Sequence, residues 1–170
     1  MATTSTGTAK VTLPTDEQIL ITREFDAPKH LVYEAYTTPE HVRRWWAGRR
    51  GEMTVAEIDL RVGGAWRYAL VAEGGFEVAF HGEYREIVPN ERIVTTEVYE
   101  GEPMGGVTEE EAKEGALNTV TFDEVDGRTT LSILVECPSK RVRNAIIDSG
   151  MEVGLQEGMD LLEQVAISLR

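Results

Sequence analysis

The segment HVRRWWAGRRG, residues 41–51, combines two adjacent indole rings with several guanidinium groups. An indole offers a large flat surface and one N–H donor, so it can hold a planar or acyl guest. We expect at least one of Trp45 and Trp46 to face a pocket; alternatively, both only fasten helices to the rest of the fold. The flanking arginines can bind an anionic head group, meet an acidic partner, or face only solvent: Arg43, Arg44, Arg49 and Arg50.

A second group of aromatic residues follows a two-residue alternation over neighbouring strand-like segments. We expect these side chains to share the inner face of a sheet and to line a cavity: Trp66, Tyr68, Phe76, Phe80 and Tyr84. The alternative is ordinary core packing without a ligand. Tyr68 and Tyr84 could also act as acids in a cyclase-like or hydrolase-like reaction, although a free phenol has a pKa of about 10.

Other chemistry has little support in the residue types. His30 and His41 have no partner at metal-ligand spacing, and alternation with Phe80 turns His81 outward. Cys137 has no neighbouring base that would activate its thiol. The chain contains no nucleophile elbow, P-loop or dinucleotide fingerprint. We therefore expect no metal, no cofactor and no catalytic residue, and the case for an enzyme rests on aromatic hydroxyls alone.

The charge pattern limits the partners. The 170-residue chain has a net charge of −13, and residues 86–170 carry 18 acidic and 7 basic residues, a balance of −11. Such a field disfavours nucleic acids and anionic membranes. A single cysteine, no apolar run long enough to span a bilayer and no basic-then-apolar leader predict a cytoplasmic protein. Nothing in the sequence distinguishes a monomer from a homodimer.

The alternation of apolar and polar residues predicts one strand, then two short helices, then six more strands. The first strand is EQILITREF, where Ile19, Ile21 and Phe25 share a face. The helices are KHLVYEAYTT and PEHVRRWW. The other strands are joined mainly by short turns, which favours a largely antiparallel sheet: EMTVAEIDL, GGAWRYALV, FEVAFHGEYREIV, RIVTTEVYE, NTVTFDEV and RTTLSILVE.

Two connections between these strands carry opposite signals. Asp126-Gly127 lies between the last two strand segments and predicts a tight type I′ hairpin. The stretch GEPMGGVTEEEAKEGA, residues 101–116, is polar, rich in glycine and acidic. We expect it to be a mobile surface loop with little fixed structure, either a plain insertion or a lid over a pocket.

The end of the chain predicts one long helix, from about Ser139 to Leu169. Glycine recurs there at 150, 154 and 158, and each glycine inside a helix costs about 1 kcal/mol relative to alanine. Either the helix lies very close to the sheet, or the missing side chains leave a void beside it. An apolar stripe passes these glycines and suits either plain core packing or a cavity wall that adapts to its guest; it includes Met151, Leu155 and Met159.

This order of elements predicts an α+β fold, in which a curved seven-stranded sheet wraps around the long C-terminal helix. A curved sheet and one helix cannot fill the space between them, so a cavity is expected. We interpret residues 1–16 as a disordered lead-in and residues 17–170 as a single domain.

Several motifs resemble a known family: ITREFDAPKHLVYEAYTTPEHVRRWW, IDLRVGGAWRYAL, HGEYREIVPNERIV, VTFDEVDGRTTLSI and SGMEVG. They resemble the helix-grip superfamily called SRPBCC or START-like, and within it the bacterial branch homologous to activators of the ninety-kilodalton heat-shock chaperone ATPase. The resemblance covers roughly residues 17–169. It implies a small-molecule cavity between the sheet and the long helix, and an association with the stress response.

These observations favour one function over two others. The favoured one is binding of a hydrophobic, aromatic or acyl, small molecule, with Arg49 and Arg50 at the rim of the cavity. The alternatives are a module that stimulates a chaperone ATPase, which the resemblance implies, and a cyclase or hydrolase in the same cavity. The fold alone does not choose between them.

Overall fold

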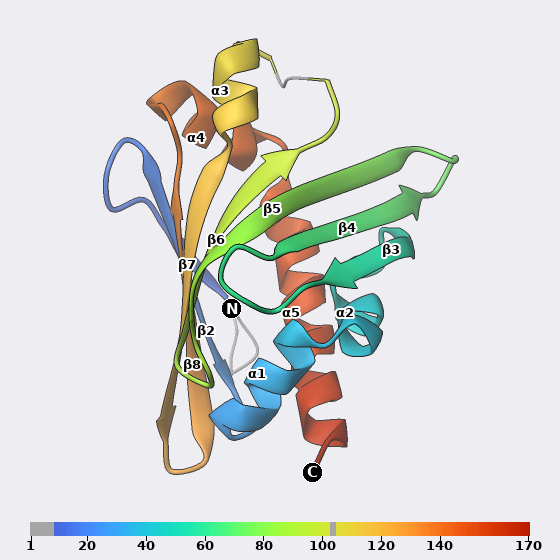
Figure 1. Cartoon of the computed structure of the whole chain (residues 1–170), viewed down its shortest axis with the longest axis vertical. Helices are drawn as coiled ribbons and strands as arrows, with labels where there is room; N and C mark the ends of the chain where they lie inside the picture. The colour runs from blue at the N-terminus through green and yellow to red at the C-terminus, as the bar shows by residue number, and fades with distance from the viewer. Residues whose placement is uncertain (1–8, 103–104) are drawn as a thin grey trace.

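A computed structural model describes residues 9–102 and 105–170 of the chain. Its main feature is one antiparallel sheet, which wraps around the C-terminal helix (Figure 1). The α+β class predicted from the sequence is confirmed, with eight strands in place of seven. In spatial order β1-β2-β8-β7-β6-β5-β4-β3, the strands are Lys10–Thr12, Gln18–Phe25, Arg128–Glu136, Ala116–Val125, Arg92–Tyr99, Glu77–Val88, Ala65–Ala72 and Gly51–Ile58.

The additional strand is β1, which pairs antiparallel with β2 through Val11 and Ile21. It falls in the segment 1–16 that we predicted to be disordered, and that prediction is wrong for residues 10–12. The backbone of this short segment finds hydrogen-bond partners along the edge of β2, a gain that the polar sequence does not reveal. Residues 1–8 lie outside the described part of the chain.

Two helices follow β2, as predicted: α1 (Lys29–Thr37) and α2 (Pro39–Trp45). Thr38 separates them with extended dihedral angles, φ −104° and ψ 123°, because the ring of the following Pro39 disfavours a helical conformation there. Val32 and Ala35 form the fully buried face of α1. Both helices pack beside the C-terminal helix (Figure 1).

The hairpin between β7 and β8 confirms the turn predicted at Asp126-Gly127. Both residues have positive φ angles, 52° and 78°, as a type I′ turn requires. Strand β8 also pairs with β2 along its length, with Ile133 opposite Ile21. The first and last parts of the chain therefore lie side by side in the sheet.

The C-terminal helix is broken, which corrects the prediction of one helix from Ser139 to Leu169. Helix α4 (Lys140–Asp148) is followed by α5 (Met151–Ser168). Gly150 lies between them with a φ of 81°, a conformation that only glycine adopts at low cost. This glycine therefore ends one helix and allows the next to start in a new direction.

The acidic segment between β6 and β7 contains a helix, α3 (Glu109–Glu114), so the prediction of a loop with little fixed structure is wrong for those residues. Thr108 and Glu111 form a capping box, in which each side chain accepts a hydrogen bond from the other's backbone amide. Arg141 of α4 also donates to Glu111 over 3.0 Å. Residues 103–104, within the same predicted loop, lie outside the described residues.

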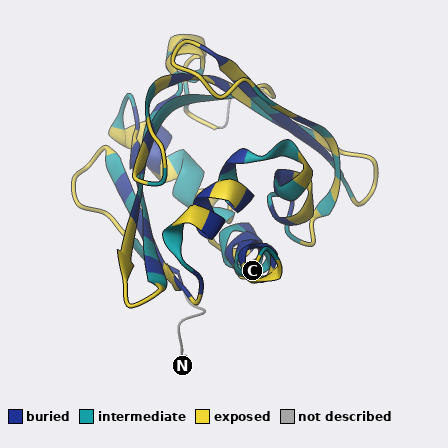
Figure 2. Cartoon of the chain, turned by 60° about the horizontal axis from the view of Figure 1, so that its bottom comes forward, coloured by how far each residue is buried: buried dark blue, intermediate teal, exposed yellow. Residues whose placement is uncertain are grey.

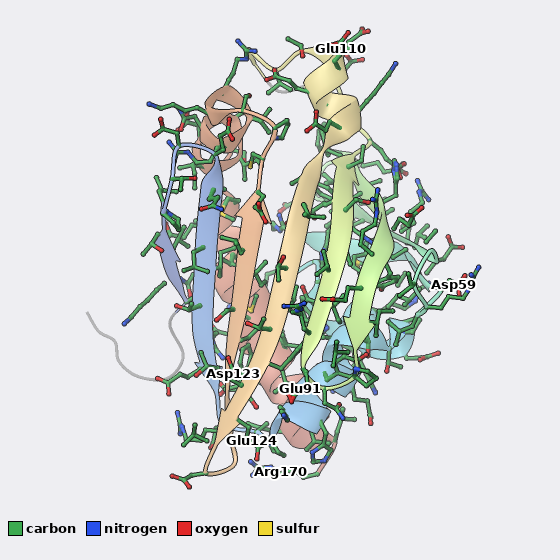
Figure 3. All side chains as sticks on the ribbon, turned by 60° about the vertical axis from the view of Figure 1, so that its left-hand side comes forward. Asp59, Glu91, Glu110, Asp123, Glu124 and Arg170 are labelled. Atoms are coloured by element: carbon green, nitrogen blue, oxygen red, sulfur yellow. The ribbon has the colours of Figure 1, made fainter. Side chains whose placement is uncertain are left out.

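The core lies between the concave face of the sheet and the helices. Seen from the C-terminal end, the sheet curves around α5, and buried and exposed residues alternate along its strands (Figure 2). Glu91 and Glu124 lie at the end of the sheet next to α1 (Figure 3). There, the Lys29 ammonium donates a hydrogen bond to Glu91, and the Lys29 backbone amide donates one to Glu124. Among the described residues, no helix is long and apolar enough to cross a membrane.

Candidate functional site

Both tryptophans of the cationic segment point into the molecule. Trp45 is buried, donates a hydrogen bond from Nε1 to the carbonyl oxygen of Ala35 over 2.9 Å, and stacks on Tyr36 with ring centroids 5.3 Å apart. Trp46 is half-buried and meets Tyr68 and Phe80 edge to face, at 5.4 and 5.7 Å. Trp45 thus fastens α2 to α1, whereas Trp46 reaches across to the sheet.

The sheet presents its own aromatic residues to these indoles. Trp66 and Tyr68 of β4 lie 4.8 Å apart, and the Trp66 indole donates to the carbonyl oxygen of Thr96 over 3.2 Å. Gly82 of β5 makes this contact possible, because a Cβ atom there would lie 2.6 Å from the indole nitrogen and 1.8 Å from the Thr96 oxygen. A close approach of backbone and ring thus fixes the position of Trp66.

Two adjoining hollows lie inside the curved sheet; α1 and α2 border the first, and α5 also borders the second. The sheet hollow has a volume of about 60 Å³ and is lined by Tyr36, Thr37, Trp45, Trp46, Trp66, Tyr68, Tyr84, Ile93, Thr95, Glu97, Asn118 and Val120. The helix hollow, of about 230 Å³, is lined by Ile19, Ile21, Tyr36, Trp45, Trp46, Arg50, Phe80, Glu97, Asn118, Ile133, Val135, Ile146, Met151, Gly154, Leu155, Gly158 and Met159.

A third hollow lies under α3 and has a volume of about 70 Å³, close to that of the sheet hollow. We call it the α3 hollow; Val107 and Ala112 line it from the α3 segment, and Ile146 lines it from α4. It shares Phe80 and Glu97 with the helix hollow. The three hollows therefore form a neighbouring series along the inner face of the sheet.

The structure brings most of the predicted cavity residues to these hollows. Every residue of that set except Phe76 borders the sheet hollow or the helix hollow: Trp45, Trp46, Trp66, Tyr68, Phe80, Tyr84, Met151, Leu155 and Met159. Phe76 instead follows the tight turn after β4 and is 64% exposed, so its assignment to the cavity wall is wrong. The turn glycines interrupt the strand, and the alternation therefore cannot be extended to Phe76.

The two arginines predicted at the rim have different positions. Arg50 borders the helix hollow, and its guanidinium covers Gly154, where an added Cβ would lie 2.8 Å from Cζ. Arg49 is exposed and borders none of these three hollows; its backbone amide contacts the Glu157 carboxylate over 3.4 Å. Only Arg50 is therefore placed to contact a molecule in the hollow.

Of the three glycines, Gly158 is explained by close packing of α5 against α2, not against the sheet. A Cβ on Gly158 would lie 3.3 Å from the carbonyl oxygen of Trp45. Gly154 faces the Arg50 side chain, and Gly150 lies outside the helix. The close approach that we expected is real, but its partner is the end of α2.

Sequence reasoning missed the most polar feature of the hollows, a contact between Glu97 of β6 and Asn118 of β7. Asn118 Nδ2 donates to Glu97 Oε1 over 3.1 Å, and Asn118 Oδ1 is buried without a hydrogen-bond partner. Burial raises the pKa of Glu97, and the bond from Asn118 partly offsets this. The signal was present, because Glu97 has the same parity in its strand as buried Ile93, and Asn118 the same as Val120.

The tyrosines of the sheet hollow are poor candidates for proton transfer. Burial raises the pKa of Tyr36, Tyr68 and Tyr84, and the neighbouring Glu97 raises the pKa of Tyr36 and Tyr68 further. A phenol with a raised pKa gives up its proton less readily than free tyrosine. This environment therefore suits the hydroxyls to hydrogen bonding more than to acid catalysis.

The remaining reactive residues lie away from the hollows. His81 faces outward, as predicted, and its Nδ1 lies 3.0 Å from the exposed Glu100 carboxylate. Cys137 is a buried free thiol, and burial raises its pKa to about 11, which favours the unreactive protonated form. Within residues 9–102 and 105–170, no three histidine, cysteine or acidic side chains gather in a way that could hold a metal ion.

Comparison with known proteins places this geometry in a family. Residues 26–166 match the family model described as "Activator of Hsp90 ATPase homolog 1-like protein". This range includes every element that lines the sheet hollow and nearly all of α5. The chain belongs to this family. The resemblance inferred from the sequence motifs, including the helix-grip architecture, is therefore confirmed.

Solved structures agree with this assignment. A protein from Rhodobacter sphaeroides is 20% identical, with a TM-score of 0.82, over 95% of this chain and 99% of the other. A protein from Chromobacterium violaceum is 27% identical, with a TM-score of 0.74, over 89% and 98%. An AHSA1-like protein from Aeromonas hydrophila is 18% identical, with a TM-score of 0.64, over 88% and 93%. A search of curated proteins found no match.

Family membership supports a ligand-binding or co-chaperone type of module, and it does not specify the ligand. The Rhodobacter and Aeromonas likenesses are too distant in sequence to say more than that the fold is shared. What this chain binds must therefore be argued from its own hollows.

Proposed function

We propose that this protein binds an apolar small molecule, aromatic or acyl, in the space between the sheet and α5. The observation that carries the proposal is the helix hollow, about 230 Å³ in volume and bordered by the aromatic rings of Tyr36, Trp45, Trp46 and Phe80. Aromatic and aliphatic walls with a few polar groups are typical of small-molecule sites. Met151 and Met159 add flexible side chains that can adjust to different guests.

The test is a substitution that fills the hollow. Leu155 borders the helix hollow, whereas Val153, two residues earlier on α5, is 68% exposed. Leu155→Trp should lower the affinity for a neutral fluorescent probe such as N-phenylnaphthylamine at least about tenfold, a loss of about 1.4 kcal/mol. The matched control Val153→Trp should leave it unchanged. Fluorescence titration measures both, and native mass spectrometry of the purified protein should detect natural guests.

Two results would contradict the proposal. One is that neither the probe nor any member of a thermal-shift panel of aromatic and acyl compounds binds the wild-type protein. The other is that Leu155→Trp and Val153→Trp bind the probe equally well, because the bound probe would then lie elsewhere. The free thiol of Cys137 fits the cytoplasmic location that we expect. A carrier or sequestering role would be compatible with that location.

The name of the family favours a second candidate function, stimulation of a chaperone ATPase. It would require a surface for the chaperone, and the exposed arginines of α2, Arg43 and Arg44, are available for an acidic partner. An ATPase assay with the heat-shock chaperone of the same organism tests it. Lack of stimulation at saturating protein removes this candidate and leaves the ligand-binding proposal intact.

A further inference from the structure

We propose that Glu97 and Asn118 form a polar anchor inside the cavity, and that the preferred ligand is an apolar arylalkyl or alkyl amine whose ammonium N–H groups reach these two side chains. This inference rests on the proposed binding function and adds the chemistry of the ligand's head group. It follows from the position of Glu97, from the unmet hydrogen-bonding capacity of Asn118 and from the charge of the surroundings.

Glu97 occupies the place where the three hollows meet. Among the residues that the structure describes, it alone borders the sheet hollow, the helix hollow and the α3 hollow together. Its side chain comes from β6 and lies diagonally across from Asn118 of β7, because Thr95 is directly opposite Asn118 in the register. A ligand in any of these hollows would therefore pass or contact the same carboxylate.

The carboxylate has a hydrogen-bond donor in Asn118 but no cation. Among the described residues, none forms an ion pair with Glu97, whereas most of the ion pairs formed by the other acidic side chains lie at the surface. A partly buried carboxylate without a counter-charge is unfavourable, and an ammonium group in the hollow would offset that cost. This is the first reason to expect a cationic head group.

Asn118 specifies the hydrogen-bonding character of that head group. Its Nδ2 donates to Glu97 Oε1, so its Oδ1 turns away and remains buried without a partner. The opposite orientation of the amide would set two oxygen atoms against each other. The groups left for a ligand are therefore Asn118 Oδ1 and Glu97 Oε2, which both accept hydrogen bonds. A ligand must present donors, and a primary amine presents up to three.

The aromatic walls around the anchor also favour a positively charged ligand. Tyr36, Trp45 and Trp46 border both the sheet hollow and the helix hollow together with Glu97. Aromatic faces attract cations, and the attraction is stronger when the cation is desolvated. The net charge of −13 also concentrates cations, rather than anions, around the protein. An amine therefore fits the interior better than the anionic head group that the arginine cluster alone would suggest.

The test compares the affinities of three probes that share a naphthalene ring: naphthylmethylamine, methylnaphthalene and naphthoate. The affinities are measured by isothermal titration calorimetry near neutral pH. The wild-type protein should bind the amine at least about tenfold more tightly than methylnaphthalene, because the amine forms charge-assisted hydrogen bonds with the anchor. Naphthoate should bind most weakly. Glu97→Gln keeps the shape and removes the charge, so the preference for the amine should shrink to within about threefold.

Two further variants serve as a control and as an independent check. Glu83→Gln changes an exposed carboxylate on the outer face of β5 and should leave all three affinities unchanged. Asn118→Leu removes the unpartnered acceptor and should lower the preference for the amine by a smaller factor than Glu97→Gln does. The check remains informative if one of the two inner variants fails to fold.

The possible outcomes separate this inference from the proposed function. If the wild-type protein binds amine and methylnaphthalene equally, or if Glu97→Gln keeps the amine preference, the anchor is refuted while cavity binding remains. If no probe binds at all, both proposals are contradicted. A preference for the amine that Glu83→Gln abolishes would locate its binding on the outer surface and would also refute the anchor.

Discussion

The two halves of α5 lie against the same sheet but have different surroundings. In the C-terminal half, Leu162 and Ala166 are fully buried and Val165 is nearly so. In the N-terminal half, Met151 and Leu155 are only partly buried, because they border the helix hollow. One helix therefore combines a segment packed as a core with a segment that forms the wall of a cavity.

Polar contacts follow the same division. Arg23 of β2, whose side chain is only 1% exposed, donates to Asp160 over 2.8 Å and lies close to Glu163. The same guanidinium lies over the ring of Phe25 at 4.6 Å. These contacts hold the C-terminal half, whereas the exposed Arg50 side chain covers Gly154 in the N-terminal half. The difference indicates that stability resides in one half and adaptability in the other.

The largest expected effect comes from shortening the same residue type in each half. Leu162→Ala should lower the free energy of unfolding by about 3–5 kcal/mol, because it creates a cavity in a closely packed core. Leu155→Ala should cost less than about 1.5 kcal/mol, because its side chain already borders empty space. Urea unfolding monitored by circular dichroism measures both. Equal losses would refute the distinction between the halves.

The next effect concerns the buried arginine. Arg23→Met should lower the free energy of unfolding by about 1–3 kcal/mol, since the partly buried Glu163 loses a cationic partner but keeps the hydrogen bond from the backbone amide of Asp26. Glu157→Gln is the control in the N-terminal half and should change stability by less than about 0.5 kcal/mol. Thermal unfolding compares them, and a neutral Arg23→Met variant would contradict the prediction.

Glycine substitutions sharpen the comparison within the N-terminal half. Gly154→Ala should stabilise the protein by up to about 1 kcal/mol through helix propensity, because only the end of the Arg50 side chain has to move. Gly158→Ala should gain less or lose stability, since its Cβ would press on the backbone carbonyl of Trp45 at 3.3 Å. Chemical denaturation of the two variants side by side tests the order, and a larger gain at Gly158 would reverse our interpretation.

The smallest effect is a dependence on pH at the edge of the cavity. The pKa of Glu97 is raised in the folded chain above its ordinary value of 4.5, so folding favours its protonated form. The stability gained from this protonation is fully present below the pKa of Glu97 in the unfolded chain. It is lost as the pH rises through the pKa of Glu97 in the folded chain. As the pH rises above 4.5, wild type should therefore lose stability relative to Glu97→Gln. A difference that stays constant with pH would show that Glu97 does not titrate in this way.

The sequence was sufficient for the order of the elements and for most of the cavity wall. Alternation in β4 and β5 placed Trp66, Tyr68, Phe80 and Tyr84 on one face, because strand periodicity acts locally and every second side chain faces inward. The hairpin at Asp126-Gly127 was predictable for a similar reason, since the turn type depends on two adjacent residues.

Other features depend on contacts that local patterns do not record. The break at Gly150 was hidden because a helical stripe of apolar residues continues on both sides of it. Helix α3 was missed because its capping box and its bond to Arg141 outweigh an acidic, glycine-rich composition. Glu97 was overlooked because a glutamate in a strand is ordinarily solvent-exposed. Its role as a polar group of the interior becomes apparent only from the hydrogen bond that Asn118 donates to it.

The bond between Ala9 and Gln156 has a consequence for how a guest reaches the interior. The Gln156 side chain accepts from the Ala9 amide over 3.0 Å and donates to its carbonyl over 2.9 Å, as a neighbouring strand would. These two hydrogen bonds join α5 to the edge of the sheet beside β1. On the other side of α5, toward α2, the Arg49 amide donates to the Glu157 carboxylate over a longer distance, 3.4 Å. We therefore expect a guest to enter beside Arg50, whose exposed side chain borders the helix hollow.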